Sequence, residues 1–251
     1  YIYEDSDNFI FSSEIKAIGN IVNLQIDVKS VMKYFQYSYV PKNKTLFKNV
    51  RKLEPGTYSC IDIVKVKRMN KVYWNLDFPS NTSTNFSSLF EESVKLRMMS
   101  DVPVGAFLSG GLDSSAIVYE MSKYNDNLET FSVGFGDGEP NELKYAKIIS
   151  DEIGTNHNEI KVDNEKVVGS IDRIIYHMDE PKGDPGFIPN FFLSEESKKK
   201  VTVALSGEGA DEILGGYQYN YINYLLDQIK KKKLKEFYQY FSDLIKKKDR
   251  R

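Results

Sequence analysis

The stretch Phe107-Leu-Ser-Gly-Gly-Leu-Asp-Ser-Ser115 is the part of this sequence that best predicts its fold. Residues 103–106 before it are small or apolar and can form a short buried strand, and residues 116–121 after it read as the buried side of a helix. Gly110 and Gly111 have no Cβ, so the backbone between strand and helix can turn sharply and approach a ligand closely. Because the free N–H groups at a helix start attract anions, this turn has the design of a phosphate-binding loop.

Asp113 is the unexpected residue in this loop, whereas Ser109 and Ser114 add hydroxyl groups that suit phosphate. A carboxylate would repel phosphate unless a cation lay between them, so the simplest interpretation is a Mg²⁺ ion that bridges Asp113 and phosphate oxygens. The alternative is that Asp113 only caps the helix. The loop is not a Walker loop, because no Lys follows the glycines, and it is not a dinucleotide fingerprint, because the two glycines are adjacent. The pattern S-G-G-L-D-S-S resembles instead the pyrophosphate loop (PP-loop) of the ATP pyrophosphatases, which cleave ATP between its α- and β-phosphates and adenylate a substrate.

Strands and helices alternate after the loop. The pattern predicts strands at residues 130–135, 158–162 and 201–205, and helices at residues 142–153, 167–178 and 188–199. Such alternation is typical of an α/β fold with a doubly wound parallel sheet, in which ligands bind at the carboxyl ends of the strands.

Two further loops follow predicted strands and carry residues suited to chemistry. The second loop is Ser206-Gly-Glu-Gly-Ala-Asp-Glu212. Like the first loop, it has small residues that allow a ligand to approach closely and carboxylates that are suited to bind a metal. Asp211 would be a second Mg²⁺ ligand, so that two loops would hold one cation. The alternative is an ordinary acidic turn. The other loop follows Val133, where exposed backbone could meet the edge of an adenine.

The first part of the chain has a different pattern of strands and short helices. Asp27 is a plausible N-cap for a helix at 28–35, and residues 57–64 alternate in part as a strand does. Residues 77–85 are polar and rich in turn formers, so we interpret them as a linker between a domain at 1–78 and a second at 79–251.

Composition excludes several classes of protein. The chain has 251 residues, 41% hydrophobic residues and a formal net charge of −2, which argues against a dedicated nucleic-acid binder. A single cysteine, Cys60, rules out an internal disulfide framework and fits a reducing compartment, so we expect a cytoplasmic protein. No apolar run is long enough to span a membrane. For the basic tail after residue 217 we favour a solvated helix face over a nucleic-acid or acidic membrane surface. We expect no catalytic role for Cys60, His157 or His177.

Several motifs together closely resemble the glutamine-dependent asparagine synthetases. On the synthetase side they are Ser100–Ser115, Asp179-Glu-Pro-x-Gly-Asp-Pro185 and Ser206-Gly-Glu-Gly-Ala-Asp-Glu-x-x-Gly-Gly-Tyr217. In the first part of the chain, Ser13–Ala17, Tyr39–Pro41, Thr45–Phe47, Lys52–Tyr58 and Tyr73-Trp74 resemble the end of that family's class II glutaminase domain.

The resemblance implies an adenine nucleotide alpha hydrolase-like fold and a ligase that makes asparagine from aspartate, ATP and glutamine-derived ammonia. Aspartate would be adenylated with release of pyrophosphate, and ammonia would then displace AMP. Adenosine would contact the backbone of Leu108 and Val133, and Ser206 and Gly207 would line the nucleotide. Pyrophosphate would be held by Ser109, Gly110, Gly111 and Ser114. Mg²⁺ would be held by Asp113 and Asp211, and Glu208 would assist adenylate formation or aminolysis.

The resemblance also limits what the chain alone is expected to do. The family's glutaminase nucleophile is an N-terminal cysteine, whereas this sequence begins with Tyr1, and the family's catalytic lysine lies in a later segment. We therefore expect an internal fragment that does not hydrolyse glutamine alone and can be inactive when isolated. The alternatives are a related amidotransferase or cyclase acting on another carboxylate, and a non-catalytic nucleotide-binding fragment. The expected partners are small molecules, with a homodimer left open.

Overall fold

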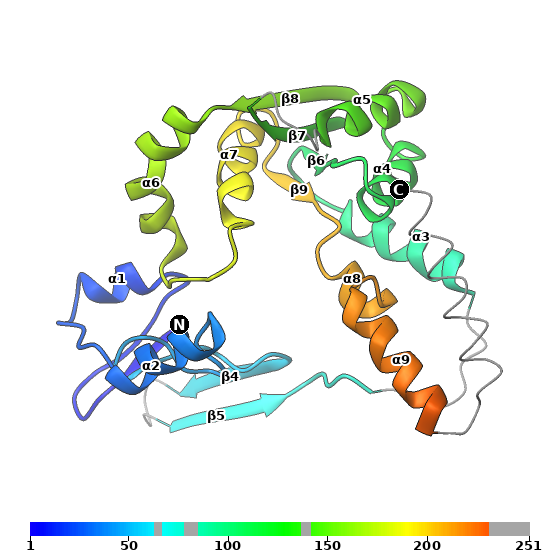
Figure 1. Ribbon diagram of the computed structural model, residues 1–251. Coiled ribbons are helices and arrows are strands. Elements are labelled where there is room, and N and C mark those ends of the chain that lie inside the picture. The colour runs from blue at the N-terminus through cyan, green and yellow to red at the C-terminus, as the bar shows by residue number, and fades with distance from the viewer. Residues whose placement is uncertain (63–66, 78–84, 137–141, 231–251) are drawn as a thin grey trace. The chain divides into compact units, whose positions relative to one another are not determined.

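A computed structural model describes residues 1–62, 67–77, 85–136 and 142–230 (Figure 1). By their contacts the residues form two compact units. The first unit contains Tyr1–Ser93, Val133–Asn141 and Glu159–Lys200, and the second contains Val94–Ser132, Glu142–Asn158 and Val201–Arg251. Most of the predicted linker lies outside the described residues, so the domain boundary at residue 78 stays a prediction.

The N-terminal part of the first unit is built on a small antiparallel sheet in the order β2-β1-β3. Its strands are β1 (Ile2–Glu4), β2 (Phe9–Phe11) and β3 (Val50–Arg51). Helix α1 (Ile15–Gly19) adds Ile15 and Ile18 to a core that also contains Tyr3 and Val50. Burial of these side chains stabilises strands that are too short to persist alone.

Two further elements of this part agree with the predictions made from the sequence. Helix α2 (Val28–Tyr37) begins after Asp27, whose carboxylate accepts a hydrogen bond from the Lys29 N–H at 3.2 Å, as the N-cap prediction requires. Strand β4 (Thr57–Asp62) pairs antiparallel with β5 (Lys67–Val72).

The first unit also contains a pair of helices from the later sequence, α6 (Asn164–Met178) and α7 (Phe187–Ser197). The Asp163 carboxylate caps α6 by accepting a hydrogen bond from the Lys166 N–H at 2.7 Å. An ion pair of 2.5 Å between Arg173 and Glu195 joins the two helices.

The predicted parallel sheet is confirmed, with four strands in the order β8-β7-β6-β9 (Figure 1). They are β6 (Val104–Phe107), β7 (Glu129–Phe135), β8 (Asn156–Val162) and β9 (Val203–Leu205). Strand β6 comes first in the sequence and pairs in parallel with both β7 and β9. The strand order therefore reverses at β6, and such a reversal opens a crevice for ligands at the carboxyl ends of the two flanking strands.

Helix α4 (Leu112–Ser122) of the second unit packs against this sheet. It contacts β6 and α5 (Glu142–Ile153), and the buried side chains include Leu108, Val118, Met121 and Phe131. The glycine predicted to end α5, Gly154, has φ +84° and donates its N–H to the Ser150 carbonyl at 2.8 Å.

Helix α3 (Phe86–Arg97) precedes β6, and helices α8 (Ala210–Leu214) and α9 (Gln218–Lys230) follow β9. Among the described residues, no helix has the length and apolar character that a membrane crossing needs.

Candidate functional site

The first predicted loop leaves the carboxyl end of β6 and is fixed by backbone contacts. Leu108 is buried, and its N–H donates to the Phe131 carbonyl of β7 at 2.8 Å. Gly110 has φ +79°, and a Cβ there would lie 2.5 Å from backbone and side-chain carbons of Tyr145 and 2.6 Å from the Ala146 nitrogen. Only glycine fits, because both the conformation and the approach to α5 exclude a side chain.

The two predicted serines hold the loop in a tight turn. Their Oγ atoms lie 3.0 Å apart, and the Ser109 N–H donates to Ser114 Oγ at 3.2 Å. The Gly111 N–H donates to Ser109 Oγ, and Ser114 Oγ donates to the Gly111 carbonyl, each at 3.3 Å. These hydroxyls therefore organise the loop backbone.

Helix α4 begins directly after this turn. Its N-cap is Gly111, and no side chain caps its first turn. Asp113 lies within that first turn and is half-buried, so the helix-capping alternative for this residue is not what the structure shows. Uncapped N–H groups at a helix start favour an anion, and they are a reason to expect phosphate here.

The second predicted loop leaves β9 and reaches the first. A Cβ on Gly207 would lie 3.2 Å from Asp113 Cβ and 3.3 Å from the Ser114 nitrogen, so the two loops touch at the reversal of the strand order. Ser206 and Glu208 are exposed beside this contact. The structure thus brings together the two loops that the sequence singled out.

The acidic residues of α8 are held within their own turn. The N–H groups of Gly215 and Gly216 donate to the Asp211 carbonyl, and a Cβ on Gly216 would fall 1.6 Å from Asp211 Oδ1. Tyr217 donates to Glu212 at 2.8 Å, and this bond to a carboxylate raises the pKa of Tyr217 to about 12. The described residues contain no cluster of three or more His, Cys, Asp or Glu that could hold a metal, so a cation shared by Asp113 and Asp211 stays a prediction.

Val133 lies in the part of β7 that belongs to the first unit, and its contact with adenine likewise stays a prediction. Sequence reasoning missed the role of Tyr145 and Ala146, whose backbone closes on Gly110. Their sequence carries no signal for it, because Tyr145 reads as one residue of an ordinary amphipathic helix.

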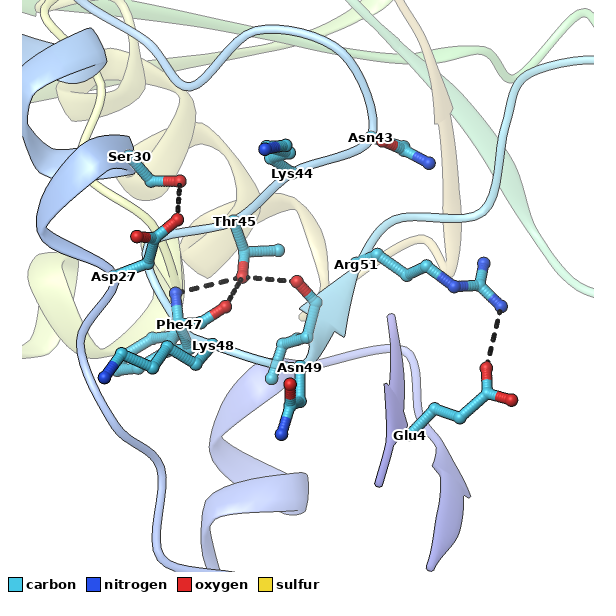
Figure 2. A pocket seen from close by; sticks show the side chains of 11 residues that line it. Glu4, Asp27, Ser30, Asn43, Lys44, Thr45, Phe47, Lys48, Asn49 and Arg51 are labelled. Atoms are coloured by element: carbon cyan, nitrogen blue, oxygen red, sulfur yellow. Dashed lines mark hydrogen bonds and ion pairs between the residues drawn. The ribbon is translucent and has the colours of Figure 1, made fainter. Parts of the chain in front are cut away.

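A separate pocket of about 450 Å³ lies in the first unit (Figure 2). Asp27 accepts a hydrogen bond from Ser30 at 2.8 Å, Thr45 Oγ1 donates to the Val50 carbonyl at 2.9 Å, and Glu4 lies 3.7 Å from Arg51. None of the predicted nucleotide-binding residues lines this pocket.

Comparison with known families gives two matches. The family described as asparagine synthase matches residues 85–251, and the glutamine amidotransferase domain matches residues 1–74. A solved structure, the NH3-dependent NAD synthetase from Campylobacter jejuni, aligns with 52% of this chain and 56% of its own at 19% identity and a TM-score of 0.35.

Curated relatives extend the similarity across most of the chain. The glutamine-hydrolysing asparagine synthetase 1 of Bacillus subtilis is 38% identical over 224 residues, which cover 84% of this chain and 34% of the relative. A Methanocaldococcus jannaschii protein, provisionally named as a second glutamine-hydrolysing asparagine synthetase, is 38% identical over 92% of this chain and 47% of its own length. The chain therefore spans between about a third and a half of these relatives. Since the asparagine synthase match contains both loops of the candidate site, this chain belongs to the asparagine synthase family.

Proposed function

We propose that this chain carries the ATP-binding part of a glutamine-hydrolysing asparagine synthetase, together with the end of its glutaminase domain. The observation that carries the proposal is the contact of Gly207 with Asp113 and Ser114, which joins both signature loops at the reversal of the parallel sheet. The names of the relatives support the reaction, and the loop geometry supports the nucleotide. The proposed domains are residues 1–78 and 79–251, and the proposed location is the cytoplasm.

The first loop fits a pyrophosphate group. Gly110 allows the backbone to close against α5, and the uncapped start of α4 offers N–H groups to an anion. In the proposal, Ser109, Gly110, Gly111 and Ser114 hold the pyrophosphate of ATP. Leu108 and Val133 contact the adenosine through their backbones, and Ser206 and Gly207 line the nucleotide.

The donor set also fits Mg²⁺, which prefers carboxylate oxygens together with substrate phosphates. Asp113 and Asp211 are the residues that would hold it, and each lies in the first turn of a helix whose N-cap residue is a glycine. When bound, the ion would offset the charge of the departing pyrophosphate.

In the proposed reaction, the bond changes take place on the substrates, and one residue of the chain accepts a proton. An oxygen of the aspartate side-chain carboxylate attacks the α-phosphorus, the bond between the α- and β-phosphates breaks, and pyrophosphate leaves. Ammonia then attacks the acyl carbon, AMP leaves, and the nitrogen must lose a proton. Glu208 is exposed at the loop and is the carboxylate that would accept this proton.

An assay with two forms of the protein tests the proposal. The chain and the complete gene product that carries it are incubated with ATP, Mg²⁺, aspartate and ammonia, and pyrophosphate and asparagine are measured. We expect aspartate-dependent pyrophosphate release from the complete product. A requirement for a different carboxylate would assign the chain to a related amidotransferase, and ATP binding without pyrophosphate release would indicate a non-catalytic module.

The substitution Asp113→Asn is expected to abolish pyrophosphate release in the complete product, because the loop loses the charge proposed to hold Mg²⁺. Asp126→Asn is the matched control, since Asp126 is an exposed aspartate of the same unit, in the turn between α4 and β7. Pyrophosphate release near the wild-type rate in Asp113→Asn would contradict the metal-ligand assignment.

A further inference from the structure

The segment that follows α6 makes an unusual set of contacts within the first unit. This docking segment, residues 179–183, begins with Asp179 at φ +59°, a conformation that residues with a side chain rarely adopt. Such a conformation costs on the order of 1 kcal/mol and persists only where surrounding contacts enforce it. The end of helix α6 does not by itself account for this conformation, so the contacts of Asp179 and of its neighbour Glu180 must enforce it.

The Asp179 side chain is only 7% exposed and binds the start of α1. Its carboxylate accepts hydrogen bonds from the N–H groups of Ile15 at 2.9 Å and Lys16 at 3.3 Å. The Lys16 Nζ lies 3.3 Å from the same carboxylate and 4.8 Å from the centre of the Tyr176 ring in α6. Figure 1 shows this end of α6 beside α1.

Glu180 is equally buried, at 7% exposure, and reaches two other parts of the N-terminal segment. Its carboxylate lies 2.8 Å from Lys52 Nζ, and Tyr1 donates its hydroxyl proton to it at 3.4 Å. Burial, followed by the charges of Glu180 and Asp179, raises the pKa of Tyr1 to about 12, so this hydroxyl remains a donor at neutral pH.

A backbone contact completes the set. The Gly183 N–H donates to the Ser38 carbonyl at 2.9 Å, and a Cβ on Gly183 would lie 2.4 Å from Ser38 Cβ. The docking segment lies in the asparagine synthase match, whereas Tyr1, Lys16, Ser38 and Lys52 all lie in the glutamine amidotransferase match.

We propose that Asp179 and Glu180 are positioning residues that hold the amidotransferase part of the chain on the synthetase part, and that this contact couples glutamine hydrolysis to amide formation. The inference rests on the proposed function. It is carried by two buried carboxylates whose ion-pair and hydrogen-bond partners lie across the two matched regions, since a buried charge without its partner is costly. From the docking segment the chain runs through α7 and β9 into the Ser206–Glu212 loop, so one continuous stretch links this contact to the candidate site.

Asp179→Asn is the sharpest variant, because asparagine keeps the size of the side chain and tolerates a positive φ but removes the charge. Losing a charge-assisted hydrogen bond should raise the population of the undocked segment about tenfold. The matched control is Asp163→Asn, which makes the same change in a carboxylate whose hydrogen bond, to the Lys166 N–H, stays within the start of α6.

The readout is the amount of glutamate formed per asparagine by the complete gene product with glutamine as nitrogen donor. We expect this ratio to rise severalfold in Asp179→Asn and in Lys52→Met, while asparagine synthesis from added ammonia stays near wild type. Restoration of the ratio by the charge swap of Lys52→Glu with Glu180→Lys would support the ion pair directly. A merely structural role would instead lower both activities together.

A second measurement tests the inference if a variant of the complete gene product folds poorly. In the chain itself, hydrogen exchange of the Ile15 and Lys16 amides should speed up in Asp179→Asn but not in Asp163→Asn. An unchanged glutamate-to-asparagine ratio in Asp179→Asn, or unchanged exchange at these amides, would overturn the inference. Failure of the wild type to make asparagine from ammonia would instead overturn the proposed function, so the two failures are distinguishable.

Discussion

At the scale of single residues, Gly110 shows how closely the loop backbone approaches α5. An alanine there would carry the cost of a positive φ and would also clash with the Tyr145 backbone at 2.5 Å. Gly154 offers a matched comparison in the same unit, since its φ is +84° and a Cβ there would meet nothing within 4 Å.

We therefore predict that Gly110→Ala destabilises the chain more than Gly154→Ala does. Gly154→Ala should cost about 1 kcal/mol of unfolding free energy through conformation alone. Gly110→Ala should cost about 1–3 kcal/mol more, because α5 must shift to make room. Urea unfolding of both variants measures the difference. Equal losses would mean that α5 does not close on this loop as described.

The sequence predicted the tight turn between β6 and α4, because a tight turn at a helix start has few chemical solutions. It did not predict which residues would lie opposite this turn. Tyr145 meets Gly110 through its backbone rather than through the chemistry of its side chain. The Asp179 carboxylate accepts hydrogen bonds from backbone N–H groups that lie 164 and 163 positions away along the chain. Such contacts arise only from the folded chain, and a local pattern contains no signal for them.

At the scale of elements, the ion pair between Arg173 and Glu195 tests how α6 and α7 are joined. The Arg173 hydrogen bond lowers the pKa of Glu195 below its ordinary value of 4.5. A carboxylate whose pKa is depressed by folding adds stability above its unfolded pKa and loses it as the pH falls through the folded value.

We predict that Arg173→Gln lowers the unfolding free energy by about 0.5 kcal/mol at pH 7, a small effect because the Arg173 side chain is 58% exposed. The difference from wild type should shrink as the pH falls below about 4.5. Lys199→Gln, which removes a local ion pair with Glu196 at the end of α7, is the control and should have a smaller effect on stability. A difference that persists unchanged at pH 3 would show that Arg173 acts through packing rather than charge.

Helices and strands were predicted correctly where the hydrophobic periodicity extends over many residues. The helix expected at 142–153 is α5, and the strands expected at 130–135 and 158–162 are extended by one and two residues in β7 and β8. Strands β1 and β3 were not predicted, because with three and two residues they are too short to show an alternation. They form through pairing with each other, which is a tertiary effect.

At the scale of the whole molecule, the parallel sheet was predicted but its strand order was not. The alternation of strands and helices establishes the class, whereas the order β8-β7-β6-β9 depends on where β9 pairs. That pairing matters for function, because it brings the Ser206–Glu212 loop against the Gly110 loop. The two contact-based units also interleave along the sequence, since residues Glu159–Lys200 join the N-terminal segment.

The order of the strands leads to a prediction about the reaction as a whole. If the touching loops hold pyrophosphate as a leaving group, ATP is cleaved between its α- and β-phosphates and an aspartate oxygen becomes bonded to AMP. Aspartate labelled with ¹⁸O in its side-chain carboxylate should then transfer one labelled oxygen to AMP for each asparagine formed by the complete gene product.

Mass spectrometry of AMP and inorganic phosphate measures this transfer, with ammonia as the nitrogen donor so that glutamine hydrolysis plays no part. Label in inorganic phosphate together with formation of ADP would contradict the assignment, because it would place the cleavage at the γ-phosphate. Gly207→Val should abolish the transfer, since a branched side chain would meet Asp113 Cβ and the Ser114 nitrogen and separate the loops. Gly169→Val, in the first unit and with nothing within 4 Å of its Cβ position, should leave it intact. Loss of label in Gly207→Val alone would show that pyrophosphate release depends on the contact between the loops that follow β6 and β9. An isolated glycine turn lacks this contact.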